Sequence, residues 1–178
     1  MTLIAEDGTG LSNANALFSA SVVMAQLELY GFSLTAYSVQ QFEESIIRCS
    51  YFMASVPRWD GFKVNGRNQT MPFPRTGLRD REGLAVPSTA VPIEIRDGLV
   101  ELVRHEVADA FSLAPSHKPN ERVRSEQIGE IRVAYDMSQL TNEAFRRAIV
   151  NFNGIVGDFL ANSAYSRGAR MAGTAIRG

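Results

Sequence analysis

The chain has 178 residues, of which 45% are hydrophobic and 21% are charged, and its formal net charge is -1 at pH 7. This length and composition favour one globular domain with an added arm, large enough to bury a core without a disulfide or a structural metal. The nearly neutral charge argues against a general polyanion-binding protein, because such domains are normally strongly basic.

The cysteine content and the apolar runs indicate where such a protein works. Cys49 is the single cysteine and cannot form an internal disulfide, so nothing indicates secretion. The start, MTLIAEDGTG, lacks the basic region and apolar run of a signal peptide. No stretch approaches the roughly 18 consecutive apolar residues of a membrane-spanning helix, so we expect no membrane partner.

Two helices are predicted in the first third of the chain. Ser12 is expected to cap the first helix, and Gly31 lies where that helix would stop. Ser38 is expected to cap the second helix with Gln41 in the capping-box position, and Pro57 ends it. The two apolar stripes are Leu11, Ala14, Phe18, Val22, Ala25 and Leu29 in the first helix, and Phe42, Ile46, Cys49, Met53 and Val56 in the second.

Residues 57–91 interrupt the helical pattern with prolines and glycines. A loop of this length in a compact domain is normally functional or anchored by its own side chains. Trp59 and Phe73 are the predicted anchors, because each buries a large area when docked. In the stretch MPFPRTGL the prolines fix an extended path and Gly77 turns the chain back. Arg75 is thereby held in place, and we expect it to bridge loop carbonyls or an acidic group on a neighbouring subunit.

Two more helices are predicted in the second half. Pro92 suits the first position of a third helix, which ends near Ala114. A fourth helix is predicted from about Thr141 to Asn162, in which glycines would allow a close helix approach or mark a kink. The glycines are Gly154 and Gly157, and the stripes are Ile95, Leu99, Leu102, Val103, Val107, Ala110 and Phe111 in the third helix and Phe145, Ile149, Phe152, Val156 and Phe159 in the fourth.

The period of the sequence changes between these two helices and again at the C-terminus. In residues 122–135, Ile131, Val133 and Tyr135 alternate with Glu130, Arg132 and Ala134, and Gly129 suits a tight turn, which together predict a short β-hairpin. Residues 164–178 hold three arginines and three glycines but no acid, which indicates an arm that orders only against something else. The sequence therefore predicts a mainly α fold. Residues 1–163 form a small bundle of about four helices with a protruding hairpin, and residues 164–178 form an extended C-terminal arm.

The motifs that would indicate catalysis, a metal or a cofactor are missing. His105 and Glu106, followed by Asp109, match the zinc motif HExxH only in part, and we interpret His105 and Glu106 as residues on the outer face of the third helix. Neither GxxxxGK[ST] nor GxGxxG occurs, and Cys49 has no histidine nearby in the sequence. We therefore expect no enzyme activity, no cofactor and no metal site.

Several short motifs, taken in chain order, resemble those of the tailed-phage head–tail adaptor family, also called connector or head-completion proteins. The resemblance covers roughly residues 10–136, and some members of that family are labelled DnaT-like single-stranded-DNA-binding proteins. Phe73 stands where the family's W-P-R-T-G step has Trp, and the segment after Asp136 is less typical. The matching stretches are SNANALF (12–18), the step Trp59-Asp60-Gly61, the step Phe73-Pro74-Arg75-Thr76-Gly77, Val91-Pro92 and the hairpin SEQIGEIRVAY (125–135).

The resemblance implies a structural virion protein that is assembled in the host cytoplasm. Its copies would form a ring, commonly a dodecamer, in the neck between the portal protein and the tail or tail-completion protein. Double-stranded DNA would pass through this channel without sequence-specific binding. In this interpretation the hairpin makes inter-subunit contacts through Arg124, Glu126, Glu130 and Arg132, and the arm binds the portal through Arg167, Arg170, Met171, Ile176 and Arg177.

A second hypothesis is single-stranded-DNA binding by the loop at residues 57–81. Trp59, Phe62 and Phe73 lie there among six basic and two acidic residues, which gives a local charge of about +4. Strand binders of this kind combine stacking aromatic side chains with a basic groove. Against it, no series of strands of the OB-fold type surrounds the loop, and the chain as a whole is slightly acidic.

Overall fold

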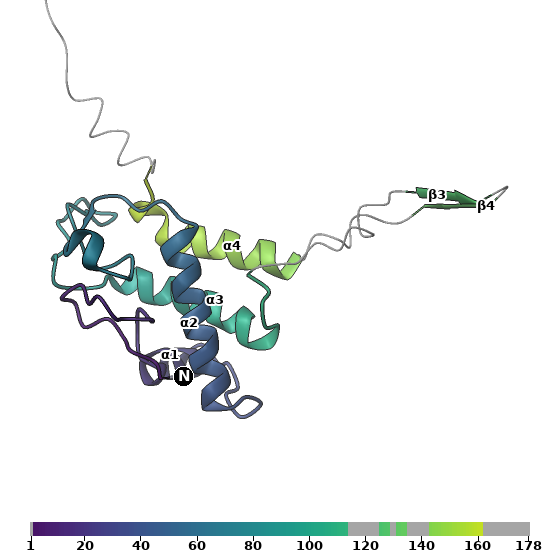
Figure 1. Cartoon of the computed structure of the whole chain (residues 1–178), viewed down its shortest axis with the longest axis horizontal. Coiled ribbons are helices and arrows are strands. Elements are labelled where there is room, and N and C mark those ends of the chain that lie inside the picture. The colour runs from purple at the N-terminus through teal and green to yellow at the C-terminus, as the bar shows by residue number, and fades with distance from the viewer. Residues whose placement is uncertain (1, 114–124, 129–130, 135–142, 162–178) are drawn as a thin grey trace, which may run out of the picture.

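The computed structural model describes residues 2–113, 125–128, 131–134 and 143–161. Four α-helices dominate this part of the chain, as the sequence predicts, and Figure 1 shows them gathered into one bundle. Their bounds are α1 Ala20–Leu29, α2 Val39–Ser55, α3 Ile93–Ala108 and α4 Glu143–Val156, with short 3-10 turns at η1 Gly66–Asn68 and η4 Gly157–Phe159. Two antiparallel pairs of strands complete the fold, β1 Phe62–Lys63 with β2 Arg75–Thr76, and β3 Ser125–Ile128 with β4 Ile131–Ala134.

The second helix forms as its local sequence predicts. The Ser38 hydroxyl accepts a hydrogen bond from the Gln41 backbone N–H at 3.2 Å, and the Gln41 side-chain oxygen accepts one from the Ser38 N–H at 2.8 Å. This capping box satisfies two N–H groups that the first turn of a helix leaves free. The predicted stripe is buried except at its end: Val56 is 62% exposed, because α2 stops at Ser55 and the apolar period stops with it.

The first helix is shorter than predicted. It begins at Ala20 with Ser19 as its cap, so the prediction that Ser12 caps it is wrong. Residues 11–18 follow an irregular path that packs beside the N-terminal segment, where Ala5 and Ala16 form a parallel bridge. The predicted stripe is therefore wrong as well, since Leu29 is 78% exposed while Val23 and Leu27 face the core.

The core lies where α3 packs against α4 and α2. α3 lies close against α4 at Gly98, where an added Cβ would come within 2.6 Å of the Val156 side chain. The predicted close approach at Gly154 and Gly157 is wrong, because a Cβ at either position would meet nothing within 4 Å, while Gly157 marks the point where α4 passes into the 3-10 turn η4. α3 also ends earlier than predicted, at Ala108, and Phe111 beyond it is 66% exposed with φ of +68°.

The predicted hairpin is confirmed in β3 and β4. Ser125 pairs with Ala134 and Ile128 pairs with Ile131, so the two strands meet across the predicted turn around Gly129. Figure 1 draws this hairpin apart from the helical bundle. Among the helices of the described residues, none is both long enough and apolar enough to cross a membrane.

Candidate functional site

The two aromatic residues of the motif loop form part of the core. Phe73 is fully buried, Trp59 is only 9% exposed, and their rings meet edge to face with centroids 4.9 Å apart. The Trp59 indole N–H donates to the carbonyl oxygen of Met53 at 2.7 Å, which ties the loop to the last turns of α2. Both predicted anchors are therefore confirmed as anchors, and neither ring is free to stack on a base.

Arg75 holds the loop together from inside. Its guanidinium donates to the carbonyl oxygens of Asp60 at 2.6 Å and Gly61 at 2.7 Å, and more weakly to those of Pro72 at 3.2 Å and Trp59 at 3.3 Å. Burial lowers the pKa of the Arg75 guanidinium, and the nearby Asp60 carboxylate opposes that effect. The predicted bridging of loop carbonyls is confirmed, and the donors of Arg75 are used within its own chain.

A buried glutamine and a lysine complete this arrangement, and the sequence analysis did not identify either. Gln69 is 2% exposed and donates through its amide to the carbonyl oxygens of Met71 and Pro74, each at 3.0 Å. Lys63 lies opposite Arg75 in the β1–β2 pair and donates to the carbonyl oxygen of Gln69 at 2.9 Å. Burial, and then the charge of Arg75, lower the pKa of the Lys63 amine.

The backbone of the loop is shaped for this set of contacts. Gly61 has φ of +64°, and a Cβ there would lie 2.3 Å from the carbonyl oxygen of Thr76. Gly77 has φ of +81°, which confirms the predicted turn, and the Phe73–Pro74 peptide bond is cis. We call the assembly of Trp59, Phe73, Pro74, Arg75 and Gly77 the motif clamp, because it ties residues 59–61 to residues 72–77.

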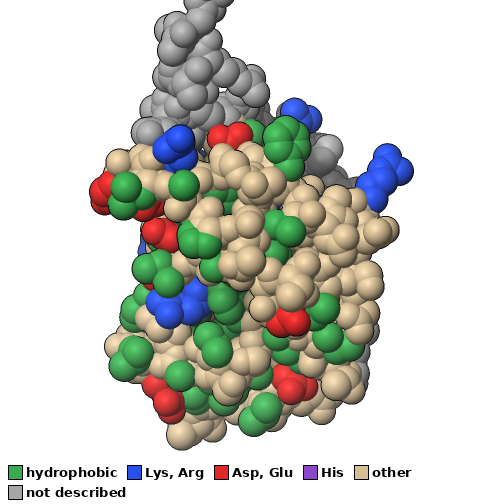
Figure 2. Space-filling view, turned by 90° about the vertical axis from the view of Figure 1, so that its left-hand side faces the viewer, with side chains coloured by type: hydrophobic (Ala, Val, Ile, Leu, Met, Phe, Trp, Pro, Cys, Tyr) green, Lys and Arg blue, Asp and Glu red, His purple; other side chains and the backbone are tan. Residues whose placement is uncertain are grey.

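The outer surface of the loop carries the remaining charges. Arg81 pairs with Asp158 at 3.1 Å and Arg79 donates to the carbonyl oxygen of Gly83 at 2.7 Å, while Arg58 and Arg67 are exposed. Phe62 is 78% exposed and is the one aromatic residue of residues 57–81 on the surface. Figure 2 shows one face of the molecule, on which the basic side chains stand apart with acidic and apolar side chains between them.

A second polar cluster lies at the C-terminal end of α3. Glu106 is fully buried and accepts from the Arg48 guanidinium at 2.6 Å. It also accepts from the Phe111 N–H at 2.8 Å, the Ser112 hydroxyl at 3.0 Å and the Leu113 N–H at 3.2 Å. The prediction that Glu106 lies on the outer face of α3 is wrong, because its carboxylate closes the turn that follows the helix.

Comparison with known proteins identifies the family of the chain. The family model described as "Putative DnaT-like ssDNA binding protein" matches residues 1–178. The chain belongs to this family. No curated protein matches the DnaT-like chain. No solved structure matches it either.

The other predicted site residues of this DnaT-like protein are only partly within the described residues. Glu126 lies in β3 opposite Val133, and Arg132 lies in β4 opposite Gln127. Arg124 and Glu130 lie outside the described residues, and so does the whole predicted portal-binding arm with Arg167, Arg170, Met171, Ile176 and Arg177. In the part of the chain that the structure describes, no three His, Cys, Asp or Glu residues are grouped to hold a metal ion.

Proposed function

We propose that this DnaT-like protein is a non-catalytic structural subunit of a tailed-phage neck, a head–tail adaptor. Its copies, commonly about twelve, would form a closed ring on the portal protein. On the side away from the portal, the ring would contact the tail or a tail-completion protein. The ring extends the channel through which double-stranded DNA passes without sequence-specific contact. Its place is the virion, after assembly in the host cytoplasm.

The observation that carries this proposal is the internal use of the motif clamp. The residues most characteristic of the motif resemblance, Trp59 and Arg75, bond to carbonyl oxygens of their own chain rather than opening towards a ligand. A motif used in this way maintains the shape of a subunit. Shape is what a ring requires, because each copy must meet the next at a fixed rotation for the ring to close.

The β3–β4 hairpin adds support. It is a two-stranded sheet, with no third strand beside it among the described residues. A lone hairpin of this kind is marginally stable in water, and its unpaired edges are suited to pairing with another chain. The hairpin edge, with Glu126 and Arg132, is therefore the expected contact between neighbouring copies.

Single-stranded-DNA binding is the second candidate, and the description of the family favours it directly. The loop proposed for it is less suited to the task, since Trp59 and Phe73 are buried and Lys63 and Arg75 donate to backbone carbonyls. Stacking by this loop would have to use Phe62, which is exposed. Single-strand binding of this kind would be detected directly in solution by its dependence on salt.

Two measurements on the full chain separate the candidates. Electron microscopy and native mass measurement, with the portal protein from the same phage present or absent, should show rings or portal-bound copies. A chain that stays monomeric with the portal present contradicts the adaptor proposal. Titration with labelled single strands at several salt concentrations tests the alternative, because contact with about three phosphates gives a log–log salt slope of about -2. Tight binding with such a slope, reduced in a Phe62→Ala variant, would support single-strand binding instead.

A further inference from the structure

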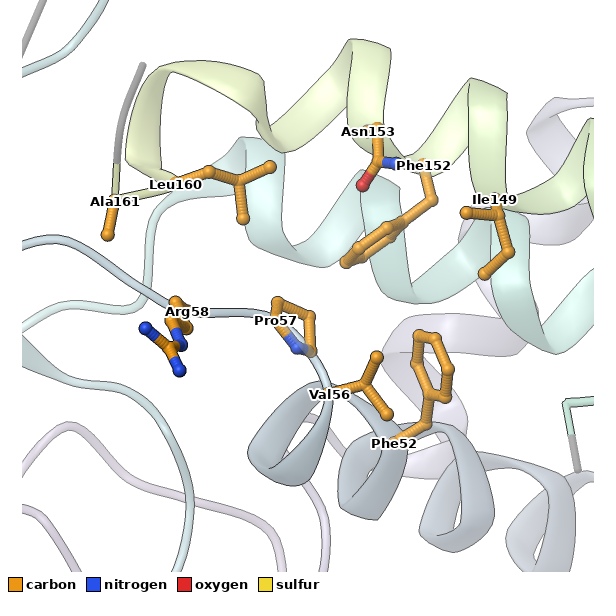
Figure 3. A pocket seen from close by; sticks show the side chains of 9 residues that line it. All are labelled: Phe52, Val56, Pro57, Arg58, Ile149, Phe152, Asn153, Leu160 and Ala161. Atoms are coloured by element: carbon orange, nitrogen blue, oxygen red, sulfur yellow. The ribbon is translucent and has the colours of Figure 1, made fainter.

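The end of the described chain borders an apolar groove of about 280 Å³. Figure 3 shows it between the C-terminal end of α2 and the side of α4, with Leu160 and Ala161 at one end. It is lined by Phe52, Val56, Pro57, Ile149, Phe152 and Leu160. Val56, one of its walls, is 62% exposed, so apolar surface at the groove is open to solvent beside an otherwise close-packed core.

The backbone at the end of the described chain is paired with the segment that borders the groove. Trp59 and Leu160 form an antiparallel bridge, in which the Asp60 N–H donates to the Phe159 carbonyl at 2.8 Å and the Ala161 N–H donates to the Arg58 carbonyl at 2.7 Å. In an antiparallel pair, each step forward on one chain is a step backward on the other. Ala161 therefore faces Arg58, and Pro57 and Val56 come next on the opposite side of the bridge, along the groove.

We propose that residues 162–166 occupy this groove in their own chain, with the Tyr165 ring as the anchor. Pro57 has no N–H to extend the ladder, so beyond it the groove offers apolar contact rather than backbone hydrogen bonds. Four extended residues after Ala161 cover about 13 Å, which brings Tyr165 past Val56 to Phe52, about 6 Å further along α2. Tyr165 is the first large apolar side chain after Ala161.

The walls of the groove suit a tyrosine ring. Phe52 and Phe152 already meet edge to face, with centroids 6.3 Å apart, and a third ring can add to such a pair. The phenol oxygen would stay at the open mouth of the groove, as is usual for an aromatic side chain with one polar end. The anchor fixes the base of the arm and leaves the segment with Arg167, Arg170 and Arg177 beyond it for other contacts.

This inference concerns the single chain and does not depend on the proposed ring. Cysteine pairs in the full chain test it, because two extended residues after Ala161, about 7 Å, bring residue 163 beside Val56 on the proposed path. The variant Val56→Cys with Ser163→Cys should form an intramolecular disulfide with oxidised glutathione, read as a loss of two hydrogens in the monomer mass. The matched control combines Ser163→Cys with Val150→Cys, on a part of α4 that does not line the groove and 68% exposed. Equal yields in both variants, or cross-links only between chains, would overturn the proposal.

A second measurement reports on the groove without new cysteines. Ile149 lines the groove, so its terminal methyl resonance should shift when Tyr165→Ala removes the ring, and should stay in place in Met171→Ala, outside the proposed anchor. If the chemical shift of the Ile149 methyl is unchanged in Tyr165→Ala, or changes equally in both variants, the assignment of Tyr165 as the anchor is contradicted. Circular dichroism of each variant checks that the helices are intact.

Discussion

Replacing Arg75 by alanine is expected to destabilise the folded protein, because four carbonyl oxygens lose their hydrogen-bond donor. The two short bonds, to Asp60 at 2.6 Å and Gly61 at 2.7 Å, are charge-assisted and contribute about 1.5 kcal/mol each. The two longer ones, to Pro72 and Trp59, add little. Arg75→Ala should therefore lower the free energy of unfolding by about 3 kcal/mol, a large part of the 5 to 15 kcal/mol typical of a domain.

Urea unfolding followed by the fluorescence of Trp59 measures this loss directly, because the chain has one tryptophan and its ring packs on Phe73 within the motif clamp. With a slope of about 2 kcal/mol per molar urea, the midpoint of Arg75→Ala should fall by about 1.5 M at unchanged slope. The matched control is Arg67→Ala, an exposed arginine of the same loop, which should shift the midpoint little. If both variants unfold alike while Arg75→Ala alone fails to assemble with the portal, the guanidinium acts across an interface and the clamp argument is refuted.

Three further predictions follow from the same structure. Gly61→Ala should lower the free energy of unfolding by about 1 to 3 kcal/mol, because its Cβ would meet the Thr76 carbonyl oxygen. Gly154→Ala, in open space within α4, should raise the free energy of unfolding by up to about 1 kcal/mol, and thermal unfolding checks both variants. Glu106→Gln should lower the free energy of unfolding by about 2 kcal/mol in denaturant titration, since it removes the buried negative charge that accepts the charge-assisted hydrogen bond of the partly exposed Arg48. Burial raises the pKa of the Cys49 thiol well above its usual value, so the thiol stays protonated in the native state while the unfolded thiol ionises above about pH 8.5, and stability should fall as pH rises past that value. A thiol reagent at pH 8 should accordingly label Cys49 only as fast as the chain unfolds.

Local sequence signals predicted those elements whose causes are local. α2 is an example, because Ser38 and Gln41 cap it from within one turn and the chain leaves the helix just before Pro57. The start of α1 was predicted wrongly at Ser12, because the helix is capped by Ser19. The choice of Ser19 depends on the contact of residues 11–18 with the N-terminal segment, which the 3–4 spacing of apolar residues does not record.

The sequence predicted that the motif loop is stiff and that Arg75 bridges carbonyl oxygens, but it did not predict which residues Arg75 contacts. The prolines of the motif loop indicate a stiff path, and an arginine on such a path was expected to bridge carbonyls. Which carbonyls it reaches depends on residues 59–61, some 15 positions away, and on a strand pair of two residues that is too short to leave a periodic signal. Glu106 did leave a signal, because it falls on the apolar face of α3 three residues after Val103, but its partner Arg48 is 58 residues distant.

The burial of the aromatic side chains distinguishes the two candidate functions. A protein that binds single strands by stacking needs aromatic rings on its surface beside basic side chains. Here Trp59 and Phe73 are buried in the core, while Arg75 and Lys63 donate hydrogen bonds to backbone carbonyls, so the basic and aromatic side chains of the loop serve mostly its own folding. A sequence count of charges and rings therefore includes side chains that this loop uses within its own chain. In the proposed ring, the same burial would hold each copy in one shape, because a flexible subunit would not meet its neighbours at one fixed angle.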